Sequence, residues 1–150
     1  MGFWLFSQKK YEKAVKKFQR GACFNKSLEV SYSGIGVCLS NLGKYEEAAE
    51  SFEKATSFSK KFTQSYLHWT LVLLIQGKGK EALEIFENVK KCDFDSNLKD
   101  LAIKAFQAES VSAKQKAAQA TDQYIRKQAQ KRHKCLQILI DLIKKTSRSQ

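Results

Sequence analysis

The segment Tyr45-Glu-Glu-Ala48-Ala-Glu-Ser-Phe52 decides the fold, because two other segments repeat its pattern at a fixed distance. Tyr11-Glu-Lys-Ala-Val-Lys-Lys-Phe18 precedes it, and Gly79-Lys-Glu-Ala-Leu-Glu-Ile-Phe86 follows it. The central alanine and the final phenylalanine of each segment both recur every 34 residues. Self-similarity at a fixed period of this length indicates a chain built from stacked structural repeats.

The residues around these segments have the spacing of helices. Apolar residues three and four apart lie on one helix face, and they precede a glycine in two units: Tyr32, Ile35 and Leu39 before Gly43, and Tyr66, Trp69 and Leu73 before Gly77. Each unit is therefore predicted to be two helices joined at that glycine, which suits a left-handed helix end. The 150 residues include no proline, where average usage would give about seven, and this also favours an all-α fold with short connections.

This pattern resembles the tetratricopeptide repeat (TPR). The middle unit carries its positions at Tyr32, Gly36, Gly43, Tyr45, Ala48, Phe52 and Ala55. The third unit departs at Thr70, Gly79 and Val89 but keeps Gly77, Ala82 and Phe86, and the first is cut short because Gly2 stands where Gly36 stands. The resemblance implies an α-solenoid of about three helix pairs over residues 1–95, the first truncated.

The last third of the chain departs from the repeat. Leu98, Leu101, Ala105 and Phe106 predict a helix that caps the open end of the solenoid. A long basic final helix follows, with an apolar stripe at Cys135, Leu136, Leu139, Ile140 and Ile143. The stripe either folds back onto the repeats or pairs with another chain, as in a dimer. We place the capping and final helices in residues 96–145 and a frayed tail in 146–150.

Catalytic chemistry is poorly represented. The two histidines are His68 and His133, and the sequence predicts no enzyme, no cofactor and no metal site. The four cysteines are far apart, which favours reduced thiols in a cytoplasmic protein. The longest apolar run, residues 71–75, is too short to span a membrane.

The resemblance also implies where a partner binds, because the first helix of each TPR unit lines a concave groove. The positions that face this groove are Phe3, Phe6, Val30, Ser33, Val37, Asn41, Gln64, Leu67, His68, Leu71 and Leu74. They are mainly apolar, which favours a protein partner that inserts an apolar peptide or an amphipathic helix. The basic clamp by which some TPR domains grip acidic C-termini is absent, since Phe3, Gly34, Gln64 and His68 stand in its places.

A narrower resemblance concerns the type III secretion chaperones of the translocator class. Their middle repeat is similar to residues 34–45, Gly-Ile-Gly-Val-Cys-Leu-Ser-Asn-Leu-Gly-Lys-Tyr, and their length is similar. The resemblance implies a chaperone or adaptor that keeps an apolar segment covered before export. The truncated first unit also leaves open that the chain is a fragment of a larger TPR scaffold.

The charge is concentrated beyond the repeats. The net charge is +12, but residues 1–110 hold 17 basic and 13 acidic residues, whereas residues 111–150 hold 10 and 2. The densest cluster is Arg126, Lys127, Lys131, Arg132 and Lys134. Nucleic acid or another anionic surface is the alternative partner, through this cluster. A solvated helix is the simpler explanation of the cluster, and base stacking is not indicated because Tyr124 is the one aromatic residue nearby.

Overall fold

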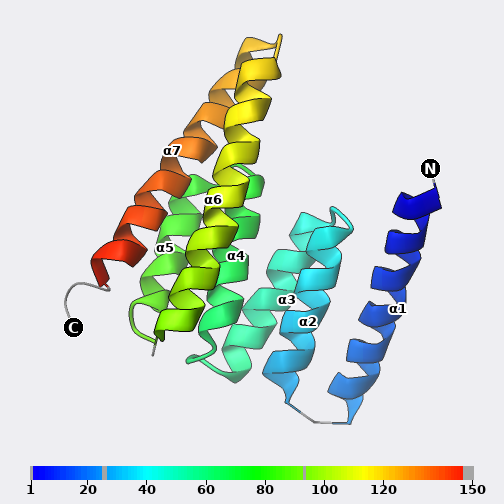
Figure 1. Cartoon of the computed structure of the whole chain (residues 1–150). Helices are drawn as coiled ribbons and strands as arrows, with labels where there is room; N and C mark the ends of the chain where they lie inside the picture. Colours follow the sequence, from blue (N-terminus) through cyan, green and yellow to red (C-terminus); the bar gives the residue numbers. More distant parts are fainter. Residues whose placement is uncertain (1, 25–26, 93, 147–150) are drawn as a thin grey trace.

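The computed structural model describes residues 2–24, 27–92 and 94–146, with side chains from Gln8 to Lys145, and confirms an all-α, solenoid-like fold (Figure 1). The helices of this described part are α1 (Gly2–Cys23), α2 (Leu28–Asn41), α3 (Tyr45–Phe58), α4 (Thr63–Ile75), α5 (Gly79–Val89), α6 (Ser96–Gln119) and α7 (Gln123–Thr146). From α1 to α5, neighbours in the chain pack side by side, and α2/α3, α4/α5 and α6/α7 form three pairs that follow α1.

The two predicted turn glycines are confirmed. Gly43 has a φ of +76° and Gly77 a φ of +79°, in the left-handed region that side chains disfavour. After each glycine, a backbone N–H donates to a carbonyl five residues back: Lys44 to Leu39 and Lys78 to Leu73, both at 2.9 Å. This pattern satisfies carbonyls that the helix end would otherwise leave unpaired, and it fixes the reversal between the paired helices.

Inside the pairs, the repeated small and large residues meet as the 34-residue period predicts. Ala48 and Phe52 are fully buried in the α2/α3 pair. In the α4/α5 pair, Ala82 is fully buried and Phe86 is 2% exposed. A Cβ atom at Gly36 would lie 2.6 Å from the Phe52 ring, so the absence of a side chain there lets α2 and α3 approach closely.

The first unit differs from the prediction. Residues Gly2–Cys23 form one continuous helix of 22 residues, not a truncated helix pair. The reason lies in the turn, because Lys9 occupies the position that Gly43 and Gly77 occupy in the other units. Without a residue that readily adopts a left-handed conformation, the helix continues through this point. It packs along α2, where the Phe18 ring covers Gly34.

The C-terminal region is a helical hairpin instead of a cap followed by one long helix. The chain reverses at residues 120–122, and Asp122 begins α7 by accepting backbone N–H groups of Tyr124 and Ile125 through Oδ1, at 2.7 and 3.2 Å. Figure 1 shows the α6/α7 hairpin projecting past the ends of the other helices. The final helix α7 extends to Thr146, the last described residue, and residues 147–150 of the predicted frayed tail lie outside the described residues.

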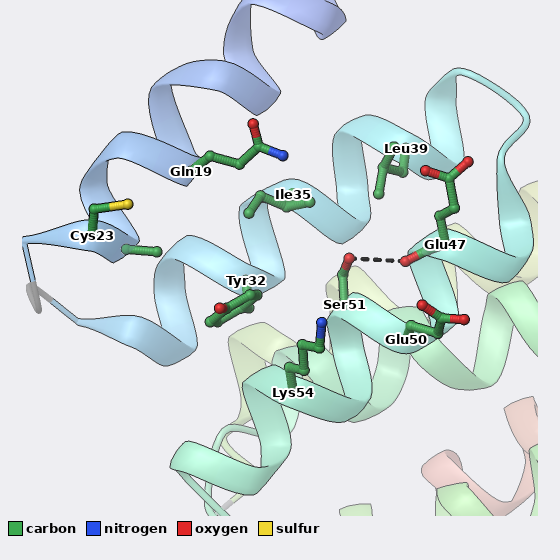
Figure 2. Close-up of a pocket in the computed structure, with 10 residues that line it drawn as sticks. Gln19, Cys23, Tyr32, Ile35, Leu39, Glu47, Glu50, Ser51 and Lys54 are labelled. Atoms are coloured by element: carbon green, nitrogen blue, oxygen red, sulfur yellow. Dashed lines mark hydrogen bonds between the residues drawn. The ribbon is translucent and has the colours of Figure 1, made fainter.

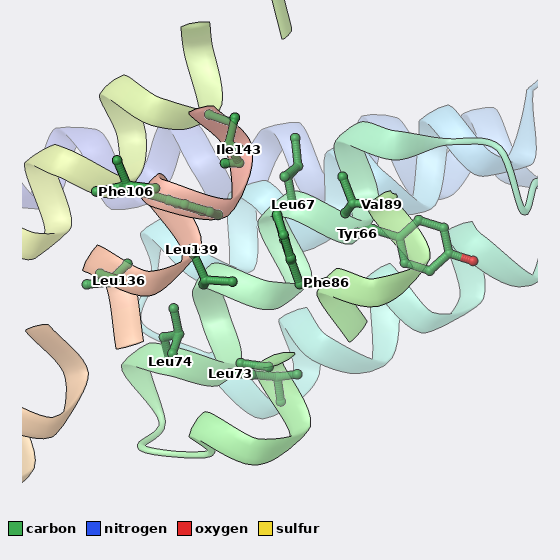
Figure 3. Close-up of a cluster of buried hydrophobic side chains, with 13 residues drawn as sticks. Tyr66, Leu67, Leu73, Leu74, Phe86, Val89, Phe106, Leu136, Leu139 and Ile143 are labelled. Carbon is green, nitrogen blue, oxygen red and sulfur yellow. The ribbon is translucent and has the colours of Figure 1, made fainter. Parts of the chain in front are cut away.

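The apolar stripe of α7 folds back onto the repeats. Leu136, Leu139, Ile140 and Ile143 are at most 2% exposed and join one core cluster with α4, α5 and Phe106 of α6 (Figure 3). Both hairpin helices contact α4, whereas α7 is the one that lies against α5. The hairpin therefore does not continue the solenoid as a regular fourth unit.

Candidate functional site

The structure divides the predicted groove residues into three groups. The side chains of Phe3 and Phe6 lie outside the described residues. Ser33, Leu67 and Leu74 are buried, at 6, 6 and 1% exposure. Five positions keep accessible surface on the side of α2 and α4 that we call the inner face: Val30, Val37, Asn41, Gln64 and Leu71.

The expectation of an open groove in the third unit is wrong. Leu67 and Leu74 belong to the core cluster that the C-terminal hairpin completes, with Leu136, Leu139 and Phe106 among their cluster neighbours (Figure 3). Sequence spacing placed them correctly on one face of α4. It gave no indication that the chain's own last helix covers that face, because this contact is remote in sequence.

His68 is also not a groove residue. Its ring stacks on Phe52, with the ring centroids 5.8 Å apart and the planes 11° from parallel. It occupies the position that Gly34 occupies in the preceding unit, where the Phe18 ring lies instead. Burial lowers the pKa of His68, because a charged imidazolium would lose its hydration there. His68 is therefore a neutral part of the contact between successive repeats.

The predicted basic cluster separates into structural and free residues. Arg132 is 17% exposed at its side chain, and its Nη2 donates to the carbonyl of Ile75 at 2.5 Å. Its Nη1 lies 3.5 Å from Oε1 of Glu109, so one guanidinium joins α7 to the end of α4 and to α6. Lys127, Lys131 and Lys134 are exposed on α7.

A cleft of about 690 Å³ opens between the hairpin helices near their tip, and we call it the hairpin furrow. Its lining comes from both helices: Lys114, Ala117 and Ala118 of α6, and Arg126, Gln130, His133 and Lys134 of α7. Ser110 joins the two helices below it, since a hydrogen bond of 2.7 Å links its Oγ to Nδ1 of His133 and Gln137 donates to the same oxygen at 2.9 Å.

A second cleft lies where α1 and α3 diverge over α2, and no sequence pattern predicted it (Figure 2). Its volume is about 520 Å³, with Ile35 and Leu39 at its floor and Glu47, Glu50 and Lys54 on the α3 side. The Lys54 ammonium lies 5.8 Å from the centre of the Tyr32 ring. These floor residues are the helix-packing residues of the repeat pattern, so their spacing alone could not distinguish a core position from a cleft floor.

Among the described residues, no group of three or more histidine, cysteine or acidic residues could hold a metal ion. The cysteines are free thiols: Cys38 is buried, which raises its pKa, whereas Cys23 is exposed. Within the part of the chain that the structure describes, no helix has both the length and the apolar character needed to cross a membrane.

Comparison with protein families assigns one segment of the chain. Residues 30–62 match the family model of the tetratricopeptide repeat, and this segment contains α2 from Val30 onward, the turn at Gly43 and the whole of α3. A search of curated proteins finds no significant match. TPR repeats generally serve as non-enzymatic protein-interaction modules, and the match therefore points to a protein as the partner.

Proposed function

We propose that the protein is a non-enzymatic chaperone or adaptor that holds an apolar peptide or an amphipathic helix of a partner on its inner face. The observation that carries this proposal is the exposure of Val30, which is 48% accessible in the first turn of α2. Val37 on the same helix and Leu71 on the adjacent α4 are half-buried and extend this apolar surface. The C-terminal hairpin covers the third unit but leaves this part open, so a partner segment has access to it.

The hairpin itself supports a helix as the bound segment. The residues by which α7 docks are spaced i, i+3, i+4 and i+7: Leu136, Leu139, Ile140 and Ile143. The α4 side of the repeats thus already packs against an amphipathic helix of the same chain, α7, and such a helix is therefore a suitable form of ligand.

Substitution of Val30 tests the proposal. Val30→Asp places a charge in the apolar surface, yet an acidic residue in the first turn of a helix is compatible with the helix dipole, so α2 should still form. We expect the variant to lose the partners that the wild-type protein captures from cells, as identified by mass spectrometry, while its circular dichroism is unchanged.

Ile138→Asp is the matched control, because Ile138 is 50% exposed on α7 and lies outside the inner face. This variant should keep the same partners. Retention of all partners by Val30→Asp, or equal losses in both variants, would show that the inner face is not the binding surface.

The narrower form of the proposal is a cytoplasmic chaperone of a secretion system. It is supported by the similarity of residues 34–45 to the middle repeat of the translocator-class chaperones. In that case the bound segment would be an apolar stretch of an exported protein. Secretion genes beside the gene for this protein, and an exported protein among the partners lost on Val30→Asp substitution, are the expected findings. Partners confined to other cellular processes would contradict this narrower role.

A further inference from the structure

The hairpin furrow concentrates positive charge from two helices. Lys114 of α6 and both Arg126 and Lys134 of α7 line the same cleft. No acidic residue is among the lining residues. Arg126 also donates from Nη2 to the carbonyl of Ala120 at 2.8 Å, which holds it at the tip of the hairpin while its other N–H groups remain for a ligand.

The surroundings of the furrow reinforce this charge. Residues 111–140 contain seven basic residues and one acidic residue, Asp122. Asp122 is engaged with the backbone at the start of α7. Arg132 is paired with Glu109 and belongs to the hairpin contact with α4, so the field at the furrow comes from the lysines and Arg126. A ligand that carries several negative charges is attracted to such a cleft.

The alanines of the furrow lining form a small apolar floor, beside the polar side chains of Gln130 and His133. Ala117 and Ala118 present only methyl groups, and Val111, 56% exposed, lies on the same face of α6 as Lys114 and Ala118. The groove between two packed helices is where a third helix packs in a bundle, and small residues allow it to approach closely. An apolar floor with a cationic rim therefore matches a helix that is apolar on one face and acidic beside it.

We infer that the hairpin furrow binds an acidic amphipathic helix of a protein partner, independently of the inner face. Two other anionic partners fit the furrow less well. A single-stranded nucleic acid would leave the alanine floor unmatched, and the described lining offers it one aromatic ring, that of His133, where successive bases need several on which to stack. A bilayer surface is broad and cannot enter a cleft between two helices.

The direct test measures binding of a defined probe to the full-length protein. The probe is a fluorescein-labelled helical peptide of glutamate, alanine and leucine, about 18 residues or about 27 Å long, with the glutamates flanking an alanine–leucine face. We expect binding by fluorescence anisotropy that weakens as salt is raised. The double variant Lys114→Glu/Lys134→Glu should lose at least about tenfold in affinity, since attraction becomes repulsion at two positions.

Two further variants separate a specific site from general charge. Lys9→Glu/Lys13→Glu changes the net charge equally on exposed positions of α1 and should keep affinity within about twofold. Ala118→Trp fills the floor at an exposed position without changing charge, and it should weaken binding as well. Circular dichroism checks that each variant is folded, and Val30→Asp should bind the probe normally.

Four outcomes would overturn the inference. The first is that the probe fails to bind the wild-type protein. The second is that Lys9→Glu/Lys13→Glu loses as much affinity for the probe as Lys114→Glu/Lys134→Glu. The third is that Ala118→Trp leaves the affinity unchanged. The fourth is that a single-stranded oligonucleotide or a vesicle of anionic lipid binds more tightly than the peptide and is the ligand released by Lys114→Glu/Lys134→Glu.

Discussion

Gly36 sets the distance between α2 and α3, because an added Cβ atom would lie 2.6 Å from the Phe52 ring, which is fully buried. Gly36→Ala must therefore displace a ring that has no free space. We expect a loss of about 1–3 kcal/mol in the free energy of unfolding, measured by urea denaturation.

Gly21→Ala is the matched control for this prediction. Gly21 is also in a helix, but the nearest heavy atom to an added Cβ, Oγ of Ser31, is 3.4 Å away. Alanine is the better helix former, so this variant should be unchanged or more stable by about 0.5–1 kcal/mol. Equal effects at both positions would mean that Gly36 is not a packing position.

His68 makes stability depend on pH. Burial lowers its pKa in the folded state below the usual 6.5, so the unfolded chain binds more protons at mildly acidic pH. The contribution of the neutral ring is fully present above pH 6.5 and is lost as the pH falls from there towards the folded-state pKa. His68→Phe keeps an aromatic ring against Phe52 but cannot titrate, and it should reduce the loss of unfolding free energy between about pH 7.5 and 5.5. Urea denaturation at both pH values measures this, and an unchanged loss in the variant would contradict it.

The residues that the sequence identified correctly are those whose role is local. The left-handed glycines and the buried alanine and phenylalanine of the second and third units follow from spacing within one unit. The roles of His68 and Arg132 do not, because each depends on a neighbour in another element: Phe52 for the first, and Ile75 and Glu109 for the second. A helical face can be deduced from the sequence, but not the partner that covers it.

At the scale of elements, Arg132 fixes the hairpin to the repeats. It donates to the carbonyl of Ile75 at the end of α4, where the negative end of the helix dipole favours a cation, and it pairs with Glu109 of α6. Arg132→Met leaves Glu109, 20% exposed at its side chain, without this cation. We expect the free energy of unfolding to fall by about 1–3 kcal/mol. This is less than the loss on breaking a fully buried ion pair, because some solvent reaches Arg132 and Glu109.

Hydrogen exchange tests where that loss falls. Amides of α6 and α7 should exchange faster in Arg132→Met, and urea denaturation gives the total loss. Lys131→Met, on the adjacent and exposed position, should change stability by less than about 0.5 kcal/mol. If both variants behave alike, or if Arg132→Met leaves exchange in the hairpin unchanged, Arg132 does not fasten these helices together.

Helix boundaries were predictable where a glycine or an apolar stripe marks them. The break at residues 120–122 was missed, since alanine, glutamine and lysine continue on both sides and favour helix throughout. Asp122, which begins α7 by accepting two backbone N–H groups, was the signal present in the sequence. The continuous α1 has a similarly small cause, the replacement of a turn glycine by Lys9.

At the scale of the whole molecule, the buried residues form two clusters that meet at α4. One contains Ile35, Leu39, Ala48 and Phe52 with Val72, and the other contains Leu73 and Leu74 with the residues of α5, α6 and α7. Each helix contacts only near neighbours, as in repeat proteins, whose stability is a sum of local units and interfaces. A destabilising substitution in one cluster should therefore lower the stability of the helices around that cluster more than the stability of the others.

Leu139→Ala tests this division. Leu139 is fully buried in the second cluster, so the variant should lose about 2–5 kcal/mol, whereas Ile138→Ala, at a position 50% exposed, should lose far less. Hydrogen exchange at low denaturant should show lower protection in α4–α7 and nearly unchanged protection in α1 and α2, because the first cluster keeps its own contacts. A uniform loss across all helices would mean that the chain unfolds as one cooperative unit. In that case the inner face and the hairpin furrow would be coupled through folding, and a substitution at either would alter binding at both.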